Sequence, residues 1–254
     1  MIRFLQCEYR KTRGRYLFLT ALVITAAQLC WILNGSYTDE FVLKNGWMML
    51  LYQLPLANAV FLPVLSMVVS SGLCDIEHRG TMFKQLYVIA ERGKLYDAKL
   101  YYGLMIMLFC VTVSWFITII FGYAKGFGGD LPVRLYLLYL LFTVIPTAAV
   151  YIFQHSLSMI FKNQAIPWIA GLLGAFLGIF SMFLPSFPVL RRMVLWGYYG
   201  TLQLVGLFGW TKETRYANAY FEVMKTDWLF FGVLIAAGLA MYLNGRMVFC
   251  RKEV

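Results

Sequence analysis

The sequence predicts an all-α integral membrane protein with six transmembrane helices, and three observations support that fold class. The chain has 254 residues, of which 61% are hydrophobic, whereas a soluble domain is about 45–50% apolar. Only 13% of the residues are charged, which is about half the share found in soluble domains. Long apolar runs extend along the whole chain. One soluble core cannot hide them, so we expect a single transmembrane domain over residues 1–254.

Each expected span is an apolar run. The first is uncharged and long enough to cross a hydrocarbon core of about 30 Å at about 1.5 Å per residue. We interpret it as a retained span, because a cleaved signal has a shorter apolar core and a small-residue cleavage site. The second run contains Pro55 and Pro63 and the fourth contains Pro146, so we expect kinks there. The spans lie at about residues 16–34, 47–70, 100–123, 135–160, 165–184 and 228–244.

A further uncharged stretch lies between the fifth and sixth spans, at residues 193–210. It is long enough to be a seventh span. Four glycines interrupt it, however, and glycine disfavours a continuous helix. Its tryptophan and tyrosine residues suit a membrane interface. We therefore expect a re-entrant, half-inserted segment, with a seventh span as the alternative.

Lysine and arginine are divided unequally between the two sides of the predicted spans. The N-terminal stretch, residues 71–99, the turn at residues 161–164 and the C-terminal tail carry 14 of the 22 basic residues. The opposite loops carry the other eight over a greater loop length. By the positive-inside rule, we expect a multi-pass protein of the cell (plasma) membrane with both termini in the cytoplasm. Basic residues at the ends of apolar runs favour lipid contact, and not nucleic acid, as the reason for the net charge of +10.

The segment from Cys74 to Leu100 is unusually polar for this chain, with nine of its 34 charged residues. Within it, residues 80–89 place apolar side chains at helical spacing and two polar side chains on the other face. We expect a short amphipathic helix that begins near Gly80 and ends before Gly93. Two interpretations remain open at this point. The helix either lies on the inner leaflet or presents its apolar stripe to a groove on a cytoplasmic partner.

Several short motifs resemble those of ABC-2 type transporter permeases. The sequences EHRGTMFKQL and ERGKLYDAK are similar to the cytoplasmic loop of that family, and Glu77, Gly80, Thr81, Leu86 and Lys99 occupy its characteristic positions. The opening FLQCEYRKTRGRY, which includes Glu8 and Lys11, is similar to the stretch that precedes the family's first span. The chain length and the FKNQ turn resemble the branch that serves bacitracin and lantibiotic resistance or self-immunity.

This resemblance implies a function and a set of partners. The short helix would be the coupling helix that docks on a separate cytoplasmic ABC ATPase dimer, which holds ATP and magnesium, so the chain itself needs no cofactor. A second permease, either another copy or a homologous chain, would complete the transport path. The cargo would be a lantibiotic or similar antimicrobial peptide expelled from the membrane. The residues implied in coupling are Glu77, Arg79, Gly80, Thr81, Met82, Phe83, Lys84, Leu86 and Tyr87.

Two further groups of residues have both a functional and a structural interpretation. Gln53 and Asn58 lie near the prolines of the second span, and Tyr52 and Trp196 lie near outer span ends. All four are candidates for a substrate path, and the alternatives are hydrogen bonds between helices and an aromatic belt. Gly174 and Gly178 form a small-xxx-small motif that brings helices close together, either within one chain or at a dimer seam.

Catalysis by the chain itself is not expected. There is no G-x-x-x-x-G-K-[ST] motif, so ATP hydrolysis must come from a partner. There is no H-E-x-x-H motif, and the five scattered cysteines include no C-x-x-C pair. His155 and Ser156 are adjacent on a helix and therefore point apart. The competing functions are a membrane scaffold or sensor without transport, an exporter of another lipid or small molecule, and a lipid-modifying membrane enzyme.

Overall fold

The protein is described from a computed structural model, which covers residues 2–35, 37, 39–79, 82–184, 188–213 and 215–252. Within these residues the elements in chain order are α1 (Ile2–Arg13), α2 (Leu17–Leu33), α3 (Glu40–Lys44), α4 (Gly46–Arg79), α5 (Phe83–Ile89), α6 (Arg92–Ala124), α7 (Val133–Ile160), α8 (Ala165–Phe183), α9 (Pro188–Met193), the 3₁₀ helix η1 (Leu195–Gly197), α10 (Tyr198–Thr201), β1 (Val205–Phe208), β2 (Tyr220–Val223) and α11 (Trp228–Arg251). The described part of the chain is thus mostly helical, as the sequence predicts.

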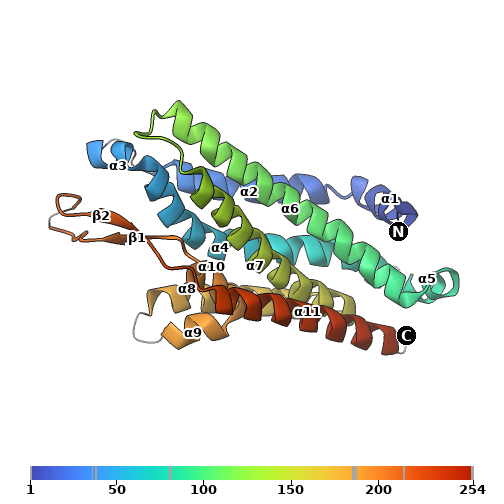
Figure 1. Ribbon diagram of the computed structural model, residues 1–254. Coiled ribbons are helices and arrows are strands. Elements are labelled where there is room, and N and C mark those ends of the chain that lie inside the picture. The colour runs from blue at the N-terminus through green and yellow to red at the C-terminus, as the bar shows by residue number, and fades with distance from the viewer. Residues whose placement is uncertain are drawn as a thin grey trace.

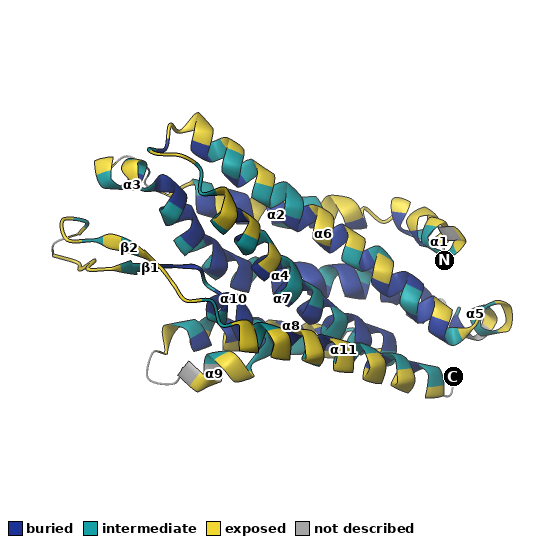
Figure 2. Cartoon of the chain, in the orientation of Figure 1, coloured by how far each residue is buried: buried dark blue, intermediate teal, exposed yellow. Residues whose placement is uncertain are grey.

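The long helices pack as a bundle around α4. This helix contacts α2, α6, α7 and α8. Two thirds of the residues in its most apolar 18-residue stretch are buried (Figure 2). The outer faces of α6, α8 and α11 stay exposed and are apolar, as with Phe116, Phe176 and Leu239. Exposed apolar faces of this extent suit contact with lipid, because in water they would drive association.

Both ends of the chain lie at one end of the bundle. Figure 1 places the N-terminal α1, the short α5 and the C-terminus together, and places α3, α9 and the β1–β2 hairpin at the opposite end. The termini and the polar segment thus lie at the same end of the bundle, and the side of the membrane on which they lie stays a prediction. The end with both termini is called the terminal end below, and the other is called the hairpin end.

Five described helices are long and apolar enough to cross a membrane, namely α4, α6, α7, α8 and α11. A sixth span is obtained if α1 and α2 are counted together, although they meet at a bend of 76°. Tyr16 forms the bend in the left-handed conformation (φ 54°), which is uncommon for a residue other than glycine. The count of five or six agrees with the predicted membrane fold.

The polar connector between the second and third spans is shorter than the sequence predicts. Helix α4 continues to Arg79, and α6 already begins at Arg92. Only residues 80–91 remain between them. Helix α5 begins at Phe83, later than the predicted start near Gly80, which itself lies outside the described residues. The prediction failed because the charges of residues 71–79 and 92–99 suggested a loop, whereas both segments are helical and two of their charged residues, Glu77 and Lys99, are paired inside the bundle.

The stretch at residues 193–210 does not form a continuous helix. It passes through η1, α10 and β1, and its tyrosines Tyr198 and Tyr199 are buried against the bundle. Strand β1 pairs antiparallel with β2 in the register Val205 to Val223. This hairpin departs from the all-helical prediction, and four-residue strands leave too short a pattern to read in sequence.

The two glycines of the small-xxx-small motif pack within the chain. A Cβ atom at Gly174 would meet the indole ring of Trp196, and one at Gly178 would meet the backbone of the same residue. Trp196 also stands edge-on to Phe153 of α7, with ring centroids 5.3 Å apart. The glycines thus let η1 lie directly on α8, which favours intrachain packing for the face that carries them.

Gly174→Ala is expected to destabilise the protein by about 1–3 kcal/mol, because the added methyl group overpacks the contact with Trp196. Gly232→Ala is the matched control. No atom lies within 4 Å of a Cβ built at Gly232. This change is therefore expected to leave the stability unchanged or to raise it by at most about 1 kcal/mol, because alanine has the higher helix propensity. Equilibrium unfolding of both variants in mixed micelles measures the difference. Equal stability of the two variants would contradict the packing role of Gly174.

Candidate functional site at the terminal end

Helix α5 projects from the terminal end of the bundle and connects α4 to α6 (Figure 1). Its apolar stripe faces inward. Phe83 is buried, with its ring centroid 4.9 Å from that of His78 in α4 and 5.7 Å from that of Phe249 in α11. Tyr87 lies 6.1 Å from the same Phe249 ring. The stripe therefore fastens α5 to its own chain.

The outward face of α5 carries a different pair of apolar residues. Val88 is 87% exposed and Ile89 is 83% exposed, and Gln85 is exposed on the turn before them. Two branched aliphatic side chains at the tip of a projecting helix form an available contact surface. We call Val88 and Ile89 the tip pair.

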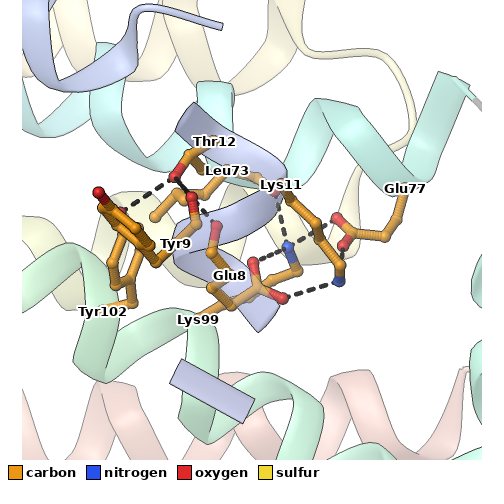
Figure 3. A network of polar contacts seen from close by, with 8 residues as sticks. All are labelled: Glu8, Tyr9, Lys11, Thr12, Leu73, Glu77, Lys99 and Tyr102. Atoms are coloured by element: carbon orange, nitrogen blue, oxygen red, sulfur yellow. Dashed lines mark hydrogen bonds and ion pairs between the residues drawn. The ribbon is translucent and has the colours of Figure 1, made fainter. Parts of the chain in front are cut away.

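A cluster of four charged side chains ties the helices together near α5 (Figure 3). The Lys99 ammonium lies 2.8 Å from Glu8 Oε2 and 2.7 Å from Glu77 Oε2. The Lys11 ammonium lies 2.9 Å from Glu8 Oε1 and 2.9 Å from Glu77 Oε1. Each carboxylate thus bridges both ammonium groups, and the net charge of the four is zero. These four residues are called the ion quartet.

Three members of the ion quartet are shielded from solvent, and the Lys11 side chain is 27% exposed. The Lys99 side chain is 1% exposed and the Glu77 side chain is not exposed at all. Lys99 also donates a hydrogen bond to the carbonyl of Leu73, at 2.8 Å. A buried charge is tolerated only when it is paired and hydrogen-bonded, and here each of the four has two oppositely charged neighbours.

Helix α1 lies before the predicted first span, and the pKa values of its two quartet members, Glu8 and Lys11, are shifted. Burial by itself raises the pKa of the Glu8 carboxyl, but Lys99 and then Lys11 outweigh it, so this pKa lies below its usual value. Burial likewise lowers the pKa of the Lys11 ammonium, but Glu77 and Glu8 outweigh it, so this pKa is raised. Both pKa shifts favour the ionised forms of Glu8 and Lys11.

The quartet joins three helices, since Glu8 and Lys11 belong to α1, Glu77 to α4 and Lys99 to α6. Helices α4 and α6 are the two that α5 connects. Their ends are thus held at a fixed separation just behind α5.

A second set of contacts joins the α5–α6 corner to the last helix. Arg92 stacks on the Tyr87 ring, 4.4 Å from its centroid, and donates hydrogen bonds to the carbonyls of Cys250 and Lys252. One turn further along α6, the Asp97 carboxylate accepts hydrogen bonds from Tyr242 and Arg246 of α11. Movement of α5 is therefore linked to α11 as well as to α4 and α6.

The structure separates the residues predicted for coupling into different environments. Glu77 lies in the ion quartet, Phe83 is buried, and Leu86, Tyr87 and Met82 are half-buried. Arg79 is exposed and pairs with Asp75 of its own helix at 2.6 Å. Gly80, Thr81 and the side chain of Lys84 lie outside the described residues.

The four residues predicted for a substrate path also make different contacts from one another. Asn58 is buried, accepts a hydrogen bond from Gln28 of α2 and donates one to Tyr139 of α7, which fits the alternative of a link between helices. Tyr52 approaches Phe221 of the hairpin, and Trp196 covers α8. Gln53 accepts a hydrogen bond from Tyr37 and lines a cavity of about 260 Å³ between α2 and α4.

Sequence reasoning missed the ion quartet and the tip pair. Its four members were recognised one by one as family positions, but nothing local shows that residues up to 91 positions apart meet. A usable signal was that both acidic residues and lysines stand beside apolar runs in these segments, because buried charges need partners. Val88 and Ile89 were overlooked because the apolar stripe was assigned to the outside, whereas α5 has apolar residues on both faces.

Comparison with known protein families gives one result. A family model described as ABC-2 family transporter protein matches residues 4–178 of the chain. The match contains α1 from Phe4 onward, α5 and all four residues of the ion quartet. A search among curated proteins finds no match.

Proposed function

The chain belongs to the ABC-2 family of transporter proteins, and on that premise we propose that it is the permease subunit of an ATP-driven exporter in which α5 is the coupling helix. Membership of the family implies association with an ABC ATPase and with the membrane. The observation that carries the proposal is the tip pair, an exposed apolar surface on a short helix that projects beyond the bundle and is fastened behind by its own chain.

In the proposed mechanism, the ATPase binds the tip pair on the cytoplasmic side. Apolar side chains of a short helix can enter a groove on a partner, and Val88 and Ile89 are the highly exposed apolar residues of α5. Nucleotide-driven movement of the ATPase then displaces α5. The ion quartet makes the ends of α1, α4 and α6 follow as one body, and the Arg92 and Phe249 contacts carry α11 along.

The coupling residues take different roles in this proposal. Val88 and Ile89 contact the ATPase, and Phe83 and Tyr87 transmit force to α11. Glu77 acts inside the permease as part of the quartet. Arg79 is exposed beside α5 and stays a candidate for contact with acidic residues of the ATPase.

The proposed cargo is a lantibiotic or similar antimicrobial peptide, with self-immunity or resistance as the result. The chain length and the FKNQ turn support this branch of the family. The cavity beside Gln53 offers an amide group in an apolar surround near the hairpin end, which suits an amphipathic molecule. The alternative cargo for the same exporter is another lipid or a small molecule.

Copurification in mild detergent with the products of neighbouring genes tests the function. An ATP-binding partner that coelutes, and whose ATPase activity rises when a candidate peptide is added, supports a peptide exporter. An ATPase partner stimulated by lipids and not by peptides would keep the permease assignment and exclude the peptide cargo. If no ATPase coelutes from cells that express the whole gene neighbourhood, the chain is a scaffold or sensor and the proposal fails.

A further inference from the structure

An open groove of about 540 Å³ lies between the α1–α2 corner and α6, at the terminal end. Its floor is formed by the buried residues Leu17 and Ile106. Its walls carry Phe18, Met105 and Phe109, all of which are about half exposed. The rings of Phe18 and Phe109 meet across it, 5.4 Å between centroids.

The mouth of the groove nearest α1 is polar and cationic. Arg13, the last residue of α1, lines it and is exposed. Beside it the hydroxyls of Thr12 and Tyr102 share a hydrogen bond of 3.0 Å. Arg10 and Arg15 flank the mouth in sequence and are exposed as well, and no ion pair among the described residues includes any of these three arginines.

The groove changes from polar to apolar along the direction of the predicted spans. Helix α6 runs from the quartet toward the hairpin end, so Tyr102, Met105 and Phe109 follow one another away from the arginines. Helix α2 leaves the same corner with Leu17 and Phe18. The groove therefore has a charged mouth at the start of a span and an apolar channel beyond it. A lipid in one leaflet has the same order, with its headgroup first and its acyl chain after it.

We propose that this groove binds an anionic phospholipid from the leaflet on the side of the N-terminus. The Arg13 guanidinium contacts the headgroup phosphate, with Arg10 and Arg15 adding positive charge nearby. An acyl chain lies along Phe18, Met105 and Phe109. The charge argues for an anionic lipid, because cationic side chains with no acidic partner attract a net negative headgroup more than a zwitterionic one. This site is independent of the cargo and of the ATPase.

Native mass spectrometry of the purified full chain, titrated in detergent with phosphatidylglycerol or phosphatidylcholine of the same acyl chains, tests the proposal. Tighter binding of phosphatidylglycerol is expected. Arg13→Gln is expected to weaken it about fivefold, the contribution of one basic residue near an anionic surface. The matched control Arg134→Gln removes an exposed arginine in the first turn of α7, outside the groove, and is expected to change nothing.

A second variant tests the apolar part without removing charge. Met105→Trp fills the groove from an exposed position and is expected to lower the binding of phosphatidylglycerol while the unfolding temperature stays unchanged. Equal binding of the two lipids would overturn the anionic assignment, as would equal effects of Arg13→Gln and Arg134→Gln. Competition by the transported peptide, or loss of the lipid on self-association, would assign the groove to the cargo or to a second copy and would also overturn it.

Discussion

Lys99→Met is expected to destabilise the protein by about 3–5 kcal/mol, the cost of breaking a buried ion pair by removing one partner. Lys99 is 1% exposed and bridges Glu8 of α1 to Glu77 of α4. Without it, two buried carboxylates share the single ammonium of Lys11. Methionine is unbranched and only one heavy atom shorter than lysine, so the effect comes mainly from the lost charge. Equilibrium unfolding in mixed micelles measures it.

Two comparisons make this result specific to the quartet. Lys94→Met removes a lysine from an exposed pair with Glu91, in which both side chains are 61% exposed, and it is expected to have little effect because solvent screens such pairs. The double variant Glu8→Gln with Lys99→Met leaves Lys11 and Glu77 as a balanced pair. The loss of stability of the double variant is expected to be smaller than the sum of the losses caused by Glu8→Gln alone and by Lys99→Met alone. Additive losses would contradict a single charge-balanced cluster.

Replacing both tip residues, Val88→Asp with Ile89→Asp, is expected to separate the permease from its ATPase while leaving the fold intact. Both side chains are more than 80% exposed, so the changes cost little in the isolated chain. In the complex they would bury two carboxylates in an apolar contact. A loss of at least about thirtyfold in ATPase binding is expected, equivalent to about 2 kcal/mol or more for a hot spot.

The matched control for the tip pair is Met193→Asp. Met193 is 78% exposed and lies in α9 at the hairpin end (Figure 1). It receives the same chemical change far from α5 and is expected to retain ATPase binding. Binding is measured by copurification in detergent, where no leaflet is present for α5 to rest on. Unchanged binding by the double tip variant would show that α5 is an interfacial helix and not a docking element.

Phe83 shows why the tertiary structure was needed to choose these substitutions. The sequence interpretation makes Phe83 an anchor for a partner, and Phe83→Asp would then appear to be the natural test. In the structure Phe83 is buried against His78 and Phe249. A carboxylate there would disturb the packing of α5 itself, and loss of coupling would carry no information about docking.

The sequence by itself determined the membrane fold class, the approximate positions of the long helices and the family. These follow from local properties, namely apolar runs of bilayer length, the distribution of basic residues and short motifs read along the chain. It also located the short helix between the second and third spans, because its periodicity lies within ten residues.

Only the tertiary structure decided which charges are buried together and which apolar face of α5 is free. Glu8, Glu77 and Lys99 come from three helices, and no local pattern records that they meet. The same is true of Gly174 and Trp196, whose contact could equally have been a seam between two copies. Contacts between distant segments depend on how whole helices pack. Apolar residues at helical spacing show that one face of a helix is apolar, but they do not show what covers that face.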